Sequence, residues 1–170
     1  KDFPTLFKAF AYFITTVKKS NTVKLLLVGK NINKKNKKLL TEINKYNLIK
    51  HVILIDETHA INEILSVVDI GIFASKGNEG FPNVIAEKML TKIPCIAANV
   101  GDAMKIVGKS GWIYQKRSWI DLNKKINLIF KKFFLNKSIW NKRKSLSRKR
   151  IINNFSLNQM VENYNNVWKK

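Results

Sequence analysis

The sequence feature that most constrains the fold is a series of short apolar runs, separated by longer segments with helical periodicity. The runs lie at residues 23–29, 51–55, 69–74, 94–98 and 111–114. Short, nearly continuous apolar runs are typical of parallel strands that are covered on both faces. Most of the intervening segments are about ten residues long or more, which suits the crossover helices that parallel strands require. The pattern therefore predicts an α/β fold, a Rossmann-like parallel sheet with helices on both faces.

Helices are expected between these runs and after the last of them. The connecting segments predict helices at about residues 2–19, 36–46 and 60–68, and from Pro82 onward. After Tyr114 the alternation stops, and residues 119–134, 138–153 and 157–168 all have helical patterns. We expect one domain over residues 1–170, with a core at 1–115 and a helical tail at 116–170.

Several of these helices carry apolar stripes that are expected to face the core. The stripes comprise Ile61, Ile64, Leu65 and Val68 in the third helix; Ile85, Ala86, Met89 and Ile93 in the fourth; and Met160, Tyr164 and Trp168 in the last.

The stretch from Ser75 to Glu87 follows the third apolar run and predicts a ligand-binding loop. Gly77 and Gly80 let the backbone turn tightly and let a ligand approach it. Pro82 fits the first helical position, where its missing N–H group is not needed. Free N–H groups and the positive end of a helix dipole suit a phosphate. Ligands of parallel sheets bind at the carboxyl ends of the strands, so Gly29, Asp56, Ser75 and Asn99 are expected to share one edge.

Two carboxylates belong to this stretch. Glu79 lies in the loop, and Glu87 lies in the helix on the flank of Asn83 and Thr91, away from the core stripe. Glu87 could accept two hydrogen bonds from a ribose diol, while amides near Phe81, Asn83 and Val84 hold phosphates. Alternatively, both are ordinary surface glutamates that complement the helix dipole. Spacing alone leaves both interpretations open.

The net charge of +21 is partly local, because residues 122–161 contain no acidic side chain. Such a surface would attract nucleic acid or anionic lipid headgroups, unless it is simply a set of solvated helix faces. The basic residues of this segment are Lys124, Lys125, Lys131, Lys132, Lys137, Lys142, Arg143, Lys144, Arg148, Lys149 and Arg150.

Other kinds of chemistry find no support in the sequence. It contains no Walker pattern, no Gly-x-Gly-x-x-Gly and no His/Cys/Asp/Glu cluster with metal-ligand spacing, so no metal or cofactor is expected. The single cysteine, Cys95, lies in an apolar run and is interpreted as a small core residue of a protein in a reducing compartment.

The stretch from Ser75 to Met89 closely resembles the Glu-x7-Glu signature of family-four glycosyltransferases with the GT-B fold. Its surroundings agree in order over residues 1–114. Residues 1–10 resemble the segment that opens the family's donor domain, and residues 23–29 resemble its first strand. Residues 93–102, followed by Ile106, Val107 and Gly111, are similar to a further family block. The resemblance implies one half of a GT-B fold.

The resemblance also implies roles for individual residues. Glu87 would hold the ribose of a nucleotide-sugar donor, and Glu79 would act at the transferred sugar or on the acceptor side of the reaction. The diphosphate would lie over Gly80, Phe81, Pro82, Asn83 and Val84, with Ser75 at the same edge and Lys1 as a phosphate ligand. Ile55 and Asp56 would seat the base. Asp56 and residues 102–105 depart from the family pattern, and Lys88 replaces a common alanine.

The implied function is that of the donor domain of a retaining, metal-independent glycosyltransferase. It would transfer a sugar to a glycan or lipid-linked acceptor of lipopolysaccharide or capsule type. The expected location is cytoplasmic, with peripheral association to the membrane as a further expectation. Because the chain begins without methionine, we expect a fragment whose N-terminal acceptor domain lies upstream, and which alone turns over little. The alternatives are an epimerase of the same architecture, or a basic module that binds membrane surfaces or, less favoured, nucleic acid.

Overall fold

Five short strands form the centre of the fold in residues 1–17 and 20–168, which the computed structural model describes. Strands β1 (Leu25–Val28) and β2 (Val52–Ile55) form one parallel sheet. Strands β3 (Gly71–Phe73), β4 (Cys95–Ala98) and β5 (Trp112–Tyr114) form a second parallel sheet, with β4 in the middle. Each of the five predicted apolar runs contains a strand, and the α/β class is confirmed.

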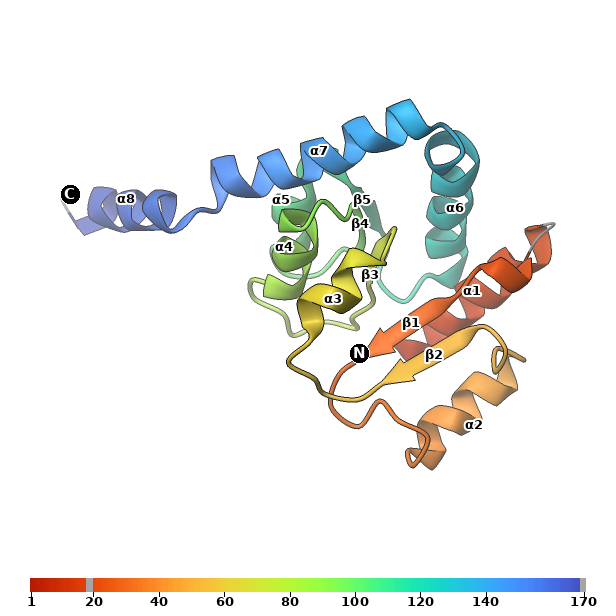
Figure 1. Ribbon diagram of the computed structural model, residues 1–170. Helices are drawn as coiled ribbons and strands as arrows, with labels where there is room; N and C mark the ends of the chain where they lie inside the picture. Colours follow the sequence, from red (N-terminus) through yellow and green to blue (C-terminus); the bar gives the residue numbers. More distant parts are fainter. Residues whose placement is uncertain (18–19, 169–170) are drawn as a thin grey trace.

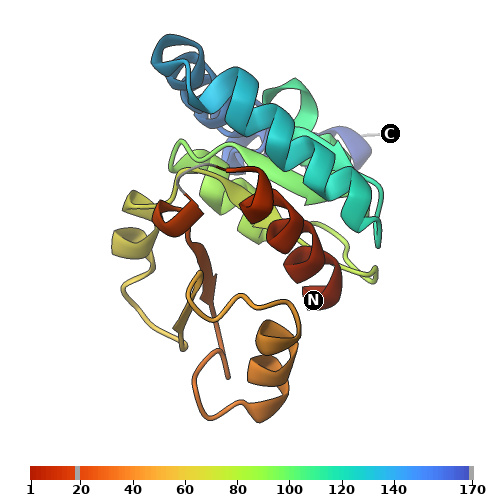
Figure 2. The same cartoon turned by 90° about the vertical axis from the view of Figure 1, so that its right-hand side faces the viewer.

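The predicted continuity of the sheet is wrong, because β1 and β3 are not paired in a common sheet. The β1 segment directs its hydrogen bonds to the β2 side, as in those from Leu25 N to His51 O and from Gly29 N to Ile55 O. Strand β3 has only three residues, so it offers few ladder bonds with which to join the two sheets. Figures 1 and 2 show β1, β2 and α2 standing apart from the larger sheet.

Helices flank both sheets. In chain order they are α1 (Phe3–Thr16), α2 (Lys37–Lys45), α3 (Ile61–Ser66), α4 (Asn83–Leu90), α5 (Ala103–Val107), α6 (Trp119–Ile129), α7 (Lys137–Asn154) and α8 (Leu157–Trp168). Single turns occur at η1 (Ser20–Thr22), η2 (Gly108–Ser110) and η3 (Phe130–Phe134), the last of them π-helical. The predicted first helix ends at Thr16, and its expected last residues, Lys18 and Lys19, lie outside the described part of the chain.

Local sequence explains several helix starts. The side chains of Asn36, Ser118 and Asn136 each accept a hydrogen bond from the backbone N–H three residues on. Such caps satisfy amide groups that have no partner within the helix. Three of the longer helices therefore begin directly after a capping residue.

The core is continuous even though the sheets are separate. All four residues of β4 are buried, as expected for a strand covered on both faces. Phe7 of α1, Ile85 and Met89 of α4, and Leu122 of α6 are fully buried in one cluster that also contains Leu25 and Leu27 of β1. Packing across this cluster, rather than strand pairing, joins β1 and β2 to the rest of the molecule.

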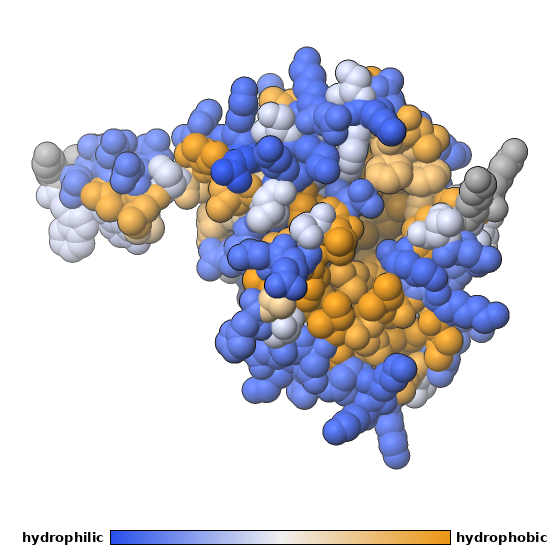
Figure 3. All heavy atoms as spheres, in the orientation of Figure 1, coloured by the Kyte–Doolittle hydropathy of each residue, from blue (hydrophilic) through white to orange (hydrophobic). Residues whose placement is uncertain are grey.

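Two predicted packing stripes are not buried. Helix α3 buries no residue: Ile61 is exposed, while Ile64, Leu65 and Val68 are half-buried. Helix α3 has only six residues, and Ile53 of β2 is exposed as well. Figure 3 shows a continuous apolar patch on this face of the molecule. Helix α8 projects away from the body (Figure 1), and its Met160, Tyr164 and Trp168 are exposed.

Helix α7 packs on α4, and its arginines contact the ends of neighbouring helices. Arg148 Nη1 lies 2.7 Å from the carbonyl oxygen of Leu90, the last residue of α4. Arg150 donates to the carbonyls of Lys105 and Ile106 in α5, and Arg143 donates to Lys109 O in η2. Guanidinium groups thus satisfy carbonyls at helix C-termini, where the dipole is negative. None of the helices in residues 1–17 and 20–168 is long and apolar enough to cross a bilayer.

Candidate functional site

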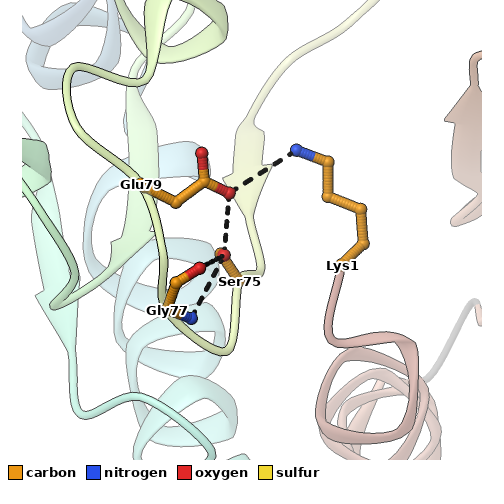
Figure 4. A network of polar contacts seen from close by, with 4 residues as sticks. All are labelled: Lys1, Ser75, Gly77 and Glu79. Carbon is orange, nitrogen blue, oxygen red and sulfur yellow. Dashed lines mark hydrogen bonds and ion pairs between the residues drawn. The ribbon is translucent and has the colours of Figure 1, made fainter.

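The loop between β3 and α4 positions a small polar network. Buried Ser75 donates from its hydroxyl to Glu79 Oε1 at 2.8 Å, and Lys1 Nζ lies 3.9 Å from the same oxygen. Gly77, at a positive φ of 144°, turns the backbone between Ser75 and Glu79. Figure 4 shows the Lys1 side chain extending toward Glu79 from the start of the first helix. The structure therefore brings together Lys1, Ser75 and Glu79, three of the predicted site residues.

Lys1 is held at this loop by the backbone of the next residue and by a contact of its ammonium group with an aromatic ring. The adjacent Asp2 N–H donates to Ala74 O at 3.0 Å, and Lys1 Nζ lies 5.2 Å from the centre of the Phe73 ring. The side chains of Lys1 and Glu79 are 58% and 26% exposed, so their ion pair adds little stability. Because the ammonium group is accessible, it can bind an anion that enters beside Glu79.

The N-terminus of α4 offers free backbone donors. Pro82 precedes the first helical residue instead of occupying it, so the predicted helix start is one residue too early. No side chain caps the helix, and the Ile85 amide bonds to Pro82 O. In the described part of the chain, the amides of Asn83 and Val84 are left without such a backbone partner. This arrangement suits a phosphate group.

The loop after β4 packs against the loop between β3 and α4. Gly101 has a φ of 48°, and a Cβ atom built on it would lie 2.1 Å from Glu79 O and 2.4 Å from Gly80 O. The next residue, Asp102, donates its N–H to Gly80 O at 3.0 Å. The sequence pattern places Asn99 at this edge, but the support that Gly101 gives was not predicted. The sequence signal that could have indicated this contact was a glycine, Gly101, in the loop directly after a strand.

Glu87 and Phe81 lie on either side of the free amides along the chain. Glu87 is exposed on α4, and its carboxylate forms no hydrogen bond or ion pair within residues 1–17 and 20–168, so it is available to a ligand. The centre of the Phe81 ring lies 5.6 Å from the centre of the Phe155 ring, and Phe155 lies in the turn after α7. Phe155 is a further residue that sequence reasoning missed, since nothing local links two rings so far apart in the chain.

The predicted base-binding residues, Ile55 and Asp56, lie at the end of the other sheet. The Asp56 carboxylate accepts hydrogen bonds from Asn31 N, Glu57 N and the Asn33 amide. The Asn33 hydrogen bond is the main cause that lowers the pKa of Asp56, helped by the Glu57 amide. This carboxylate therefore fixes the loop after β1. Asp56 and Ser75 end different sheets and do not share the continuous edge that was expected.

Two buried groups near the site have altered pKa values. Burial raises the pKa of the Cys95 thiol to about 12, so Cys95 is a neutral core residue, as predicted. Burial also lowers the pKa of Lys88, whose stem lies where a side chain on Gly71 would be. Among the described residues, no group of three or more potential metal ligands is found.

Substituting Ser75 by alanine tests the polar network. We expect Ser75→Ala to lower the free energy of unfolding by about 1 kcal/mol, because the half-buried Glu79 loses a hydrogen bond. Denaturant unfolding measures the change. Ser66→Ala is the matched control, since Ser66 donates to a backbone carbonyl on an exposed helix, and its loss should have a smaller effect. Equal losses in the two variants would contradict a specific role for Ser75.

Comparisons with solved structures show which folds this chain resembles. The crystal structure of a glycosyltransferase from Rickettsia africae is 25% identical, with a TM-score of 0.83 over 99% of this chain and 44% of that one. Anabaena HepE in complex with UDP-glucose is 23% identical, with a TM-score of 0.69 over 86% of this chain and 40% of the other. The C-terminal domain of LpcC from Francisella tularensis is 18% identical, with a TM-score of 0.70 over 92% and 80%.

These likenesses define the fold as one half of a GT-B glycosyltransferase, and the chain spans less than half the length of the Rickettsia protein. A search of curated protein sequences finds no significant match. The family model described as glycosyl transferases group 1 matches residues 1–132. Since that match covers most of the sequence, the chain belongs to the glycosyl transferases group 1 family.

Proposed function

We propose that this chain is the donor-binding half of a retaining glycosyltransferase. It binds a nucleotide diphosphate sugar whose sugar passes to a glycan or lipid-linked acceptor of lipopolysaccharide or capsule type. The observation that carries the proposal is the arrangement at the start of α4. Two free amides, at Asn83 and Val84, lie in the chain between two glutamates. The first, Glu79, is held by Lys1 and Ser75, and the carboxylate of the second, Glu87, is unpaired.

Each part of the donor has a chemical counterpart at this site. The Glu87 carboxylate accepts hydrogen bonds from a ribose diol. The amides of Asn83 and Val84, together with the α4 dipole and Lys1, neutralise the diphosphate without a metal ion. The loop from Gly80 to Pro82 forms the floor beneath it. Glu79, fixed by Ser75, faces the transferred sugar.

In the proposed reaction, an acceptor hydroxyl attacks the anomeric carbon from the face that the diphosphate leaves. The bond from that carbon to the phosphate oxygen breaks as the bond to the acceptor oxygen forms, so the configuration is retained. The acceptor proton passes to the departing phosphate oxygen. Lys1 and the helix N-terminus stabilise the negative charge that develops there, which is the charge that most needs stabilisation in the transition state.

Two structural neighbours support the choice of ligand. HepE was solved with UDP and glucose and with UDP-glucose. TarM from S. aureus was solved with UDP and alpha-GlcNAc-glycerol. Both are under 25% identical to this chain, so they establish the fold, while their ligands make UDP the first nucleotide to test.

The proposal includes a partner domain. Acceptor binding and the second wall of the cleft would come from an N-terminal domain of the same protein, and the reaction would take place in the cytoplasm. This chain alone is therefore expected to bind the donor weakly and to turn over little or none of it.

Calorimetric titration with UDP, GDP and ADP tests the site. We expect Glu87→Ala to weaken binding of the preferred nucleotide at least tenfold, since a hydrogen bond to a charged group contributes roughly 1.5–3 kcal/mol. Glu63→Ala is the matched control, because Glu63 is an exposed carboxylate in the first turn of another helix, and it should bind like wild type. The assignment fails if no nucleotide binds or if Glu87→Ala binds as well as wild type.

A further inference from the structure

The corner where α6 passes through η3 into α7 has two chemically distinct faces. Its inner face consists of aromatic rings packed on the core. Phe130 lies 5.4 Å from Phe13, and Phe133 lies 5.4 Å from Trp112, between ring centres. Phe134 lies 5.8 Å from buried Trp140. These contacts fix which side chains of the corner face outward.

The outer face combines lysines with exposed apolar side chains. Leu135 is 67% exposed, Ile139 44% and Leu128 42%. Figure 3 shows apolar and hydrophilic surface side by side at this corner, at the upper right. We call this surface the lysine–leucine corner; it comprises Leu128, Lys131, Lys132, Leu135, Lys137 and Ile139.

The charge of the lysine–leucine corner is uncompensated. Its three lysines are exposed and form no ion pair within residues 1–17 and 20–168. The sequence has no acidic residue between Asp121 and Glu162, so no carboxylate of the same segment can neutralise it. The surface is therefore complementary to a negatively charged partner.

The arginines of the same segment are not part of this surface. Arg143, Arg148 and Arg150 all donate to backbone carbonyls of other elements. Arginine is the residue most suited to bidentate contacts with nucleic-acid phosphates and base edges, and here each of the three guanidinium groups already donates to at least one backbone carbonyl. Exposed leucine and isoleucine among lysines instead suit the boundary between lipid headgroups and acyl chains.

We propose that the lysine–leucine corner binds the surface of an anionic lipid bilayer. The lysines contact headgroup phosphates, and Leu135 and Ile139 enter the interface. Phe133 packs on Trp112, the first residue of β5, so the corner lies at the amino end of that strand. Ser75 and Glu79 follow the carboxyl end of β3, which runs in the same direction. Lipid binding therefore leaves the loop between β3 and α4 accessible and does not depend on the proposed function.

Co-sedimentation with vesicles tests this surface in the 170-residue chain. Wild type should bind vesicles of phosphatidylcholine mixed with phosphatidylglycerol and should bind phosphatidylcholine alone far less. The variant Lys131→Gln/Lys132→Gln/Lys137→Gln should bind the mixed vesicles at least tenfold more weakly, since each lysine near such a surface strengthens binding roughly fivefold. The control Lys37→Gln/Lys38→Gln/Lys50→Gln removes the same charge from exposed lysines elsewhere and should bind nearly like wild type.

A second variant tests the apolar contribution. Leu135→Ser/Ile139→Ser should weaken vesicle binding most at high salt, where the lysines are screened. Circular dichroism verifies that each variant is folded. The proposal is overturned if wild type does not prefer the anionic vesicles, if both lysine variants lose binding equally, or if duplex DNA binds at the corner more tightly than vesicles do. UDP titrations of the corner variants should match wild type, so failure here and failure of the donor site remain distinguishable.

Discussion

Gly101→Ala is expected to lower the free energy of unfolding by about 3 kcal/mol and to weaken nucleotide binding at the same time. A residue with a side chain at a φ of 48° costs roughly 1 kcal/mol or more. The new Cβ would also overlap the carbonyl oxygens of Glu79 and Gly80, at 2.1 and 2.4 Å, which forces the loop between β3 and α4 to shift. Denaturant unfolding and calorimetry with UDP measure the two effects.

Gly80→Ala is the matched control for this prediction. Nothing lies within 4 Å of a Cβ atom built on Gly80, so the fold should tolerate it. It should nevertheless weaken nucleotide binding if a diphosphate approaches the backbone there. Finding Gly101→Ala as stable as wild type would show that the two loops do not support each other as the structure indicates.

Arg150→Met is expected to lower the free energy of unfolding by about 2 kcal/mol. The substitution keeps most of the apolar stem but removes the guanidinium, which donates to Ile106 O at 2.8 Å and to Lys105 O. Hydrogen bonds from charged groups contribute roughly 1.5–3 kcal/mol, and the half-exposed position places this one in the lower part of that range. The end of α5 also loses a cation that complements its dipole.

Lys149→Met controls for the change in charge and in side-chain type at the neighbouring position. Lys149 is exposed and donates to no carbonyl in the described residues, so its loss should change the stability by less than about 0.5 kcal/mol. Thermal or denaturant unfolding of both variants gives the comparison. Equal effects would mean that the arginine acts only through net charge.

The local features of this protein were predictable from sequence. Every strand coincides with an apolar run, because a strand such as Cys95–Ala98 must be apolar throughout to be buried on both faces. The loop between β3 and α4 was predictable as a loop because its glycines lie within a few residues of each other, although the start of α4 was predicted one residue too early. Glu87 lies on the exposed flank that its helical spacing predicts.

The features that escaped prediction all depend on contacts between distant segments. Whether β1 pairs with β3 is decided by packing over the whole core, and no local pattern encodes it. The same holds for the contact of Gly101 with the loop between β3 and α4 and for the contact of Phe155 with Phe81. The basic segment at residues 122–161 shows most clearly what sequence alone cannot predict. Its pattern does not distinguish arginines that donate to backbone carbonyls of other elements from lysines that remain exposed.

The division of the strands into two sheets has a thermodynamic consequence for the proposed donor site. A nucleotide that reached from Ile55 to the N-terminus of α4 would contact residues of both sheets, which are joined by core packing and not by strand pairing. Its binding free energy would then include the work of bringing the sheets into one arrangement. A partner that favours that arrangement would therefore raise the affinity for the nucleotide. By linkage, the nucleotide would raise the affinity for that partner by the same factor.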